Sequence, residues 1–514
     1  MKDQFSRREF IRNTGLGVMS LSSVQTGRTQ AHRKPNILLL HVDQYRHDCL
    51  GVCGNKDVLT PNIDKLAADG VRYENSFCPY PVCTPSRYSL VSGQYVHEHR
   101  GFNNRSTLSP DIDTFPKLLR SAGYKTSAVG KMHYTPTYLD VGFDKMILSE
   151  QDGPGRWDDD YHRYLMKKGL VDRNDLVDQR SEYRKNASQE YRDSFGAMVS
   201  NLEEPHHSTT WVGRNAAEDI QSWDDSVPNL LMVGFIKPHH PFDPPAPWHE
   251  MYDPDKMNIL PGWTEECLEH DYLYSKGYFD NKTVNKKALR KVMAYYYATI
   301  SHIDSQIGNL IQLLKQKKMY DDTMIIFTSD HGDYLGFHHM LLKSNYLYDP
   351  LTKVPLIIKN PGSSKAGTVS SNMVNNIDLA PTILSSVGIK PAPSMKGFDL
   401  NNPNSGHETI FSGRTTVMAR TRTLKLIQTK RKNAPNLFFD LQKDPLEMNN
   451  QYDNPKYQGE IKKLTASIDA WQPEEDRKKK IFVDHNAPQI NQPNVPSLDL
   501  SHRKAIIEYY QKNT

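Results

Sequence analysis

The segment around Cys83 places an oxidisable thiol beside a proline and an arginine. Cys83 is followed by Pro85, Ser86 and Arg87, and then by the helical pattern of residues 88–93. A cysteine followed by proline and arginine is common enough by chance that this segment alone does not identify a site. Its meaning depends on whether other residues able to do chemistry occur in a matching arrangement.

Oxygen-donor side chains follow two apolar runs that have the pattern of strands. Asp43 and Gln44 come after the first run, and Asp330 follows another, with His331 next in the chain. Carboxylate and amide oxygens on rigid strand ends suit a divalent cation such as calcium or magnesium. An Asp-His-Gly sequence alone is more often a turn than a ligand pair. Together with Asp43 and Gln44, it predicts a metal site.

Basic and imidazole side chains follow two further runs of the same kind, and another lysine lies 12 residues after His331. Taken singly, each would ordinarily be a surface lysine or a structural histidine. Together they can offset the charge of an anionic ester and move protons at its reacting oxygens. These residues are Lys131, His133, Lys237, His239, His240 and Lys343.

Short apolar runs separated by helical patterns must position all of these residues. Their length and their leucine and β-branched content predict buried strands of a mainly parallel sheet, and hence an α/β fold. Ligands gather at the carboxyl ends of such strands. The predicted strands are 36–41, 126–129, 230–235, 324–328 and 354–358, and the predicted helices include 63–69, 115–121 and 285–317.

Two later regions depart from this alternation. Residues 150–226 are charged, contain Tyr and Trp and lack a strand pattern, so they are either an insertion that shapes a substrate cleft or a solvated addition. Residues 423–428 and 436–440 alternate like a hairpin, and residues 456–471 have the pattern of a closing helix. Residues 405–514 are therefore expected to form a small α+β domain with an antiparallel sheet.

The first 31 residues differ from the rest of the chain. Arg7 and Arg8 precede Phe10 and a weakly apolar run, which resembles a signal for the twin-arginine export machinery and implies a bacterial periplasmic or otherwise exported protein. These residues carry +3 of the formal net charge of +4, with five basic and two acidic side chains. The remaining charge gives no indication of nucleic-acid binding. No run approaches the roughly 18 apolar residues of a membrane span.

The cysteine content argues against a disulfide-rich protein. Five cysteines in 514 residues are too few for a disulfide framework, and their odd number leaves at least one unpaired. Cys49 and Cys53 do not have the spacing of a zinc knuckle or a redox pair, so both are expected to serve packing.

The segment Cys83–Arg87 resembles the maturation signature of the type I sulfatases of the alkaline phosphatase superfamily, in which the cysteine is oxidised to formylglycine. Further blocks match in the family order: Gly130–His133, Lys237–Phe242, Ser329–Asp333, Lys343 and, near the C-terminus, Phe439–Pro445. The resemblance implies an alkaline-phosphatase-like α/β fold, a large mainly parallel sheet flanked by helices, with a catalytic domain over residues 32–404. It also implies a sulfuric ester hydrolase whose formylglycine is made by a maturation enzyme.

The same resemblance implies a role for each candidate residue. Modified Cys83 is the nucleophile, His133 the base and His239 the general acid, with His240 the weaker alternative to His239. Lys131, Lys237 and Lys343 bind the anionic substrate, and Arg87, Lys131 and Lys343 also stabilise the transition state. One divalent cation, with calcium preferred over magnesium or manganese, is expected on Asp43, Gln44, Cys83, Asp330 and His331.

Alternatives remain at the level of substrate. Gln44 stands where many family members have a second aspartate, and the Asp-Gln form also occurs in phosphonate monoester hydrolases. A phosphonate monoester or phosphodiester hydrolase is therefore an alternative to a sulfatase acting on a sulfated carbohydrate. An aryl or choline sulfate is another possible substrate. If Cys83 is unmodified, a non-catalytic protein that binds sulfated glycans is the remaining alternative.

Overall fold

The computed structural model describes residues 34–151, 159–174, 187–363 and 365–490, together with residues 508 and 512. The chain divides into two units, residues 1–34 and 35–514. The export signal expected over residues 1–31 lies outside the described residues. None of the helices in the described part is long and apolar enough to cross a membrane.

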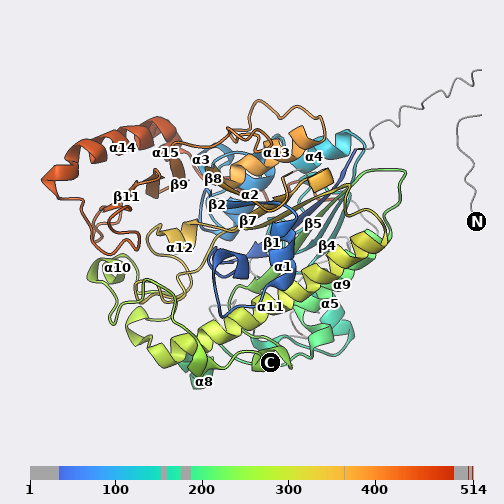
Figure 1. Cartoon of the computed structure of the whole chain (residues 1–514), viewed down its shortest axis with the longest axis horizontal. Helices are drawn as coiled ribbons and strands as arrows, with labels where there is room; N and C mark the ends of the chain where they lie inside the picture. The colour runs from blue at the N-terminus through green and yellow to red at the C-terminus, as the bar shows by residue number, and fades with distance from the viewer. Residues whose placement is uncertain are drawn as a thin grey trace, which may run out of the picture. The chain divides into compact units, whose positions relative to one another are not determined.

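A large mixed sheet forms the centre of the second unit (Figure 1). Within the described residues it has eight strands in the order β4-β3-β5-β1-β6-β7-β2-β8. Most neighbours are parallel, while β7 runs antiparallel to β6 and β2. The strands are β1 (Asn36–Asp43), β2 (Val71–Phe77), β3 (Lys125–Gly130), β4 (Lys145–Leu148), β5 (Asn229–Pro238), β6 (Thr323–Ser329), β7 (Leu356–Lys359) and β8 (Thr368–Asn375).

The predicted strands are confirmed as β1, β3, β5, β6 and β7, and the sequence analysis missed β2, β4 and β8. Helices cover both faces of the sheet, which explains why β1, β5 and β6 are apolar almost throughout. Leu38, Leu40 and Val42 face one core, whereas Ile37 and Leu39 face the other. Alternate residues of β1 thus hold the two helical layers together.

The first core is formed with α1, α9 and α11, and Figure 1 shows the long helix α11 running beside α1. Helix α9 lies within residues 150–226 and packs against β5 and α11, so this part of the segment belongs to a helical layer of the sheet. The second core is formed with α2, α4 and α13. These helices are α1 (Pro61–Ala68), α2 (Cys83–Ser92), α4 (Phe115–Ser121), α9 (Ser208–Gln221), α11 (Lys286–Gln316) and α13 (Leu379–Ser386).

A second, antiparallel sheet follows in the C-terminal part, in the order β12-β11-β10-β9. The predicted hairpin is the β11–β12 pair, and the predicted closing helix is α14, which packs on the sheet through Ile461, Leu464 and Ile468. The elements are β9 (Ile410–Gly413), β10 (Thr416–Arg420), β11 (Leu424–Thr429), β12 (Leu437–Asp440) and α14 (Gln458–Trp471). The shorter helices are α3 (Val96–His99), α5 (Asp160–Lys167), α8 (Gln189–Asp193), α10 (Glu269–Tyr274), α12 (Asp349–Thr352) and α15 (Glu474–Lys478).

The cysteines, all within the described residues, are unpaired. Cys49 is buried, as expected for a packing residue. The same expectation for Cys53 is wrong, because this residue is exposed at the end of a single helical turn, residues 51–53, where Arg72 Nη1 lies 4.0 Å from its sulfur.

Candidate active site

Four neighbouring strands deliver the candidate residues to one edge of the large sheet. β1 ends at Asp43, β3 ends just before Lys131, β5 carries Lys237 near its end, and β6 ends just before Asp330. Because β3, β5, β1 and β6 are adjacent and parallel, their carboxyl ends meet at this edge. Cys83 joins them as the first residue of α2.

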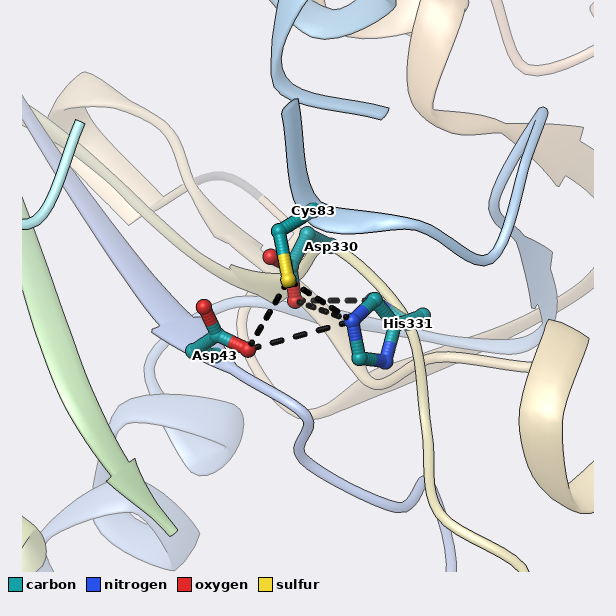
Figure 2. Close-up of side chains that lie close together, drawn as sticks. All are labelled: Asp43, Cys83, Asp330 and His331. Carbon is teal, nitrogen blue, oxygen red and sulfur yellow. Dashed lines mark hydrogen bonds and ion pairs between the residues drawn. The ribbon is translucent and has the colours of Figure 1, made fainter. Parts of the chain in front are cut away.

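Four potential metal ligands, which we call the metal group, face one another at this edge (Figure 2). Ligand atoms of Asp43, Cys83, Asp330 and His331 all lie within 4.8 Å of one another, and all four residues are buried. The Cys83 Sγ is 3.7 Å from Asp43 Oδ1 and 3.3 Å from His331 Nε2. His331 Nδ1 donates to the Gly332 carbonyl at 2.9 Å, which leaves Nε2 unprotonated toward the group.

Gln44 adjoins this group and contains a buried oxygen without a partner. Its backbone adopts φ +58, and its N–H donates to Asp330 Oδ1 at 3.0 Å. Its side-chain Oε1 has no hydrogen-bond partner among the described residues, although the residue is fully buried. An unsatisfied buried oxygen costs about 1–3 kcal/mol. Carboxylates, an amide oxygen and an oriented imidazole fit a divalent cation at this position.

Arg87 connects the two carboxylates of the group. Its Nε lies 3.0 Å from Asp330 Oδ2, its Nη2 lies 3.1 Å from Asp43 Oδ2, and its Nη1 donates to the Lys131 carbonyl at 2.6 Å. The Lys131 ammonium is 2.6 Å from Asp43 Oδ2. Burial opposes ionisation of Asp43, but the charges of Lys131 and Arg87 hold its pKa well below the ordinary value. Asp43 is thus anionic before any cation binds.

Lys343 brings the thiol and His239 together. Its Nζ lies 3.1 Å from Cys83 Sγ, 3.1 Å from His331 Nε2 and 3.2 Å from His239 Nε2. The His239 Nδ1 donates to the His240 carbonyl at 2.6 Å, so Nε2 is the acceptor toward Lys343. The His240 ring stacks on His239 at 4.1 Å between ring centroids. His239 is therefore the histidine of this pair that contacts Lys343.

Titration in this region is governed by burial. Burial and then Asp43 raise the pKa of the Cys83 thiol to about 11, so an unmodified thiol is protonated at neutral pH. Burial also lowers the pKa of His133 and of His239 well below the ordinary value, with neighbouring positive charges adding to the effect. Both imidazoles are neutral in the folded protein.

His133 and Lys237 occupy different surroundings. Neither ring nitrogen of His133 has a hydrogen-bond partner among the described residues, and the His133 carbonyl accepts from Thr84 Oγ1 at 2.8 Å, next to Cys83. The Lys237 ammonium is held by Asp243 Oδ1 at 2.5 Å and by the Pro241 carbonyl at 2.8 Å. These two contacts of Lys237 lie within its own loop, whereas Lys131 contacts Asp43, and Lys343 contacts Cys83 and His331.

Glu150 and Gln151 belong to this edge and were missed by the sequence analysis. Glu150 accepts from the backbone N–H of Met132 at 3.0 Å and of His133 at 2.9 Å. Gln151 accepts from Lys131 Nζ at 3.1 Å and donates to the His240 carbonyl at 2.7 Å. Both follow β4, so recognising that short strand would have found them by the same strand-end rule.

A second group of potential ligands lies elsewhere, formed by His270, Asp271 and His338. Its polar atoms already satisfy one another. The Tyr348 hydroxyl donates to Asp271 at 2.8 Å, and His338 bridges Asp271 and the Leu446 carbonyl at 3.2 and 3.0 Å. This network is a structural link to the C-terminal part.

Two family models and several known proteins match this chain. The Sulfatase family model matches residues 35–389, and the model for the C-terminal part of N-sulphoglucosamine sulphohydrolase matches residues 337–474. An arylsulfatase of Clostridium perfringens is 31% identical, over 83% of this chain and 92% of that protein. An N-acetylglucosamine-6-O-sulfatase of Bacteroides thetaiotaomicron is 26% identical, over 89% of each chain.

Solved structures share the fold. A phosphonate monoester hydrolase of Agrobacterium radiobacter superposes with a TM-score of 0.70 at 23% identity, over 85% of this chain and 95% of that one. A protein in complex with its substrate D-glucosamine-2-N,6-O-disulfate gives 0.69 at 22% identity, over 87% and 100%. The family match covers more than half of the sequence and includes every strand of the large sheet. The chain therefore belongs to the sulfatase family of sulfuric ester hydrolases.

Proposed function

We propose that this protein is an exported enzyme that hydrolyses sulfate monoesters of carbohydrates, with formylglycine made from Cys83 as the nucleophile. The observation that carries the proposal is the position of Cys83. Cys83 is the first residue of α2 and is 1% exposed, and its sulfur contacts Lys343 and two potential metal ligands. Export rests on the arginine pair at Arg7 and Arg8.

The residues around Cys83 suit an anionic ester. Asp43, Gln44, Asp330 and His331, with residue 83, would hold one divalent cation, preferably calcium, which when bound neutralises charge on the ester oxygens. Formylglycine, when formed, supplies a hydrated aldehyde whose hydroxyl is the nucleophile. Lys131 and Lys343 add two positive charges beside that position, and they stabilise the negative charge that develops during transfer.

Proton transfer falls to two neutral imidazoles. With Nδ1–H fixed on the His240 carbonyl, the Nε2 of His239 has no proton of its own. It can accept one from the Lys343 ammonium and pass it to the leaving alcohol oxygen, which leaves Lys343 neutral. His133 is neutral and has ring nitrogens available to accept the proton of the residue-83 hydroxyl. Glu150 holds the His133 backbone and thereby fixes where that ring lies.

A carbohydrate leaving group is supported by aromatic side chains near His239. Tyr278 packs on the His240 ring at 5.1 Å and on Phe279 at 4.9 Å. Tyr278 and Phe279 also line a cavity of about 530 Å³, together with Tyr191 and Phe195. Tyr278 and Phe279 are half-buried, and partly exposed aromatic faces with polar neighbours suit a sugar ring. The N-acetylglucosamine-6-O-sulfatase relative points to the same class of substrate.

Phosphonate monoester or phosphodiester hydrolysis is the second candidate, and Gln44 favours it. An amide in place of a carboxylate lowers the negative charge of the metal site by one, which changes the fit to a given ester. Matched sulfate and phosphonate esters of one alcohol separate the two candidates by their relative kcat/KM.

The decisive experiment is fragment-resolved mass spectrometry of the tryptic peptide Tyr73–Arg87 from protein made together with a maturation enzyme. Fragment resolution is needed because Cys78 lies in the same peptide. An aldehyde at position 83, absent from a Cys83→Ala control, supports the proposal. An intact thiol at position 83 overturns it and leaves a binding protein for sulfated glycans.

A further inference from the structure

Gln44 is held by a carboxylate on the side away from its unpartnered oxygen. Its Nε2 donates to Asp333 Oδ2 at 2.6 Å, and both side chains are fully buried. A planar amide presents its oxygen and its nitrogen in different directions, so fixing the nitrogen also fixes where the oxygen points. Oε1 is the atom of this amide that has no hydrogen-bond partner among the described residues.

Asp333 is itself fixed by the backbone. Its Oδ1 accepts from the N–H groups of Leu335 at 2.7 Å and Leu342 at 3.0 Å. These bonds determine the orientation of the carboxylate and leave Oδ2 for the Gln44 amide. The loop that carries Leu342 continues into Lys343, so one carboxylate connects Gln44 to the segment that places the lysine.

We propose that Asp333 is a positioning residue that turns the Gln44 amide so that Oε1 is presented as a metal ligand. Its charge also polarises the amide, because a carboxylate that accepts from the N–H₂ group increases the negative charge on the oxygen. Carboxylates play the same part behind metal-binding histidines. The inference rests on the metal site of the proposed function.

This arrangement accounts for an amide at position 44. The Asp43–Gln44 pair has one carboxylate fewer than an Asp–Asp pair, and Asp333 restores that charge one side chain further from the cation. The site keeps a nearby negative charge while its ligand is neutral. The attraction for the cation is then weaker than that of a directly bound carboxylate.

The test is calcium titration by calorimetry of the metal-free full chain. Asp333→Asn is expected to lower the affinity by about 10–100-fold, the range seen when such supporting residues are removed. In a Gln44→Ala background the same change is expected to have no further effect. An unchanged affinity, or an equal loss in both backgrounds, would overturn the proposal.

A charge exchange keeps the test independent of simple destabilisation. Gln44→Glu alone loses the bond to Asp333 and is repelled by that carboxylate, so the side chain loses the orientation of a ligand and the affinity should fall at least tenfold despite the added charge. Combined with Asp333→Asn, whose amide can donate to the new carboxylate, it should recover the affinity to within about threefold of wild type. Failure of this rescue in a folded double variant contradicts the positioning role.

The matched control is Asp378→Asn. Asp378 is also fully buried and accepts from two backbone N–H groups, at 2.7 and 2.8 Å, away from the metal group. The Asp378→Asn variant should have a lower melting temperature and an unchanged calcium affinity. A wild-type protein that binds no calcium, magnesium or manganese would also overturn the inference, whereas its turnover of sulfate esters decides the proposed function separately.

Discussion

Arg87 and Asp330 form an ion pair of 3.0 Å in which neither side chain is exposed to solvent. The same guanidinium reaches Asp43 at 3.1 Å, so one planar cation holds two carboxylates that would otherwise repel each other. The geometry needs the fork of an arginine, because a lysine offers a single nitrogen.

Arg87→Lys should therefore lower the free energy of unfolding by about 1–3 kcal/mol, since one ammonium cannot replace the three hydrogen bonds to Asp330, Asp43 and the Lys131 carbonyl. Urea denaturation of the metal-free protein measures this change in the free energy of unfolding. The matched control is Arg120→Lys. Arg120 pairs with Asp140 at 3.1 Å but is 34% exposed, so this variant should change the free energy of unfolding by less than about 1 kcal/mol. Equal effects of the two variants would contradict this account of Arg87.

Cys83→Ala should abolish turnover of every sulfate ester while the fold is kept, because no other described residue replaces the nucleophile at that position. Turnover assays check the loss of activity, and far-ultraviolet circular dichroism checks that the fold is kept. Cys78→Ala is the control, since Cys78 lies in the same tryptic peptide and is also buried, and its backbone N–H donates to the Thr352 carbonyl at 2.8 Å. Turnover by Cys83→Ala comparable to wild type would refute the nucleophile.

His239→Asn should affect poor leaving groups most, because a general acid matters when the departing oxygen is basic. We expect kcat/KM to fall by about 10²–10⁴-fold for a sugar sulfate, but by less than about tenfold for 4-nitrophenyl sulfate. His240→Asn should lower both rates by a common factor. If His239→Asn also lowers both rates equally, His239 is not the acid.

Tyr278→Ala should weaken binding of carbohydrate esters. Removing the ring takes away a stacking surface, so KM for a sulfated disaccharide should rise about tenfold while kcat for methyl sulfate is unchanged. Tyr278→Phe keeps the ring and serves as the control. An identical KM in both variants would place the sugar elsewhere.

Glu150 should make stability depend on pH. Burial raises its pKa from 4.5 to about 7, so the folded state binds the proton more tightly than the unfolded state does. Its contribution is fully present below pH 4.5 and is lost as the pH rises to about 7, a change of about 3 kcal/mol. Glu150→Gln mimics the protonated form and should remove that dependence.

Urea denaturation at pH 5 and pH 8 measures the effect of Glu150. The wild type should lose more stability between these values than the variant does. Parallel pH profiles for the two proteins would mean that the carboxyl group is ionised in the fold at both pH values.

The sequence predicts the centre of the sheet better than its edges. Strands β1, β5 and β6 are covered on both faces and are therefore continuously apolar. β8 is partly exposed along its first half and contains Ser and Asn, while β4 has only four residues. Polar or short edge strands lack the pattern that identifies a buried strand.

The difference between recognisable and unrecognisable strands also decides which site residues could be predicted from the sequence. Asp43, Lys131 and Asp330 stand at the ends of recognisable strands, so their convergence follows from the topology. Glu150 depends on the unrecognised β4. Asp333 acts through a contact with a residue 289 positions away, and no local spacing indicates such a contact.

The separation of Cys83 and Lys343 along the chain also determines how long after Cys83 the ribosome makes Lys343. The two residues touch in the fold but are 260 positions apart. At about 5–20 residues per second, a ribosome needs about 13–50 s to make that stretch. During this interval the thiol lacks the lysine and His331 that later enclose it. If Cys83 is oxidised as proposed, a maturation enzyme can reach the thiol before Lys343 has been translated and has packed against it.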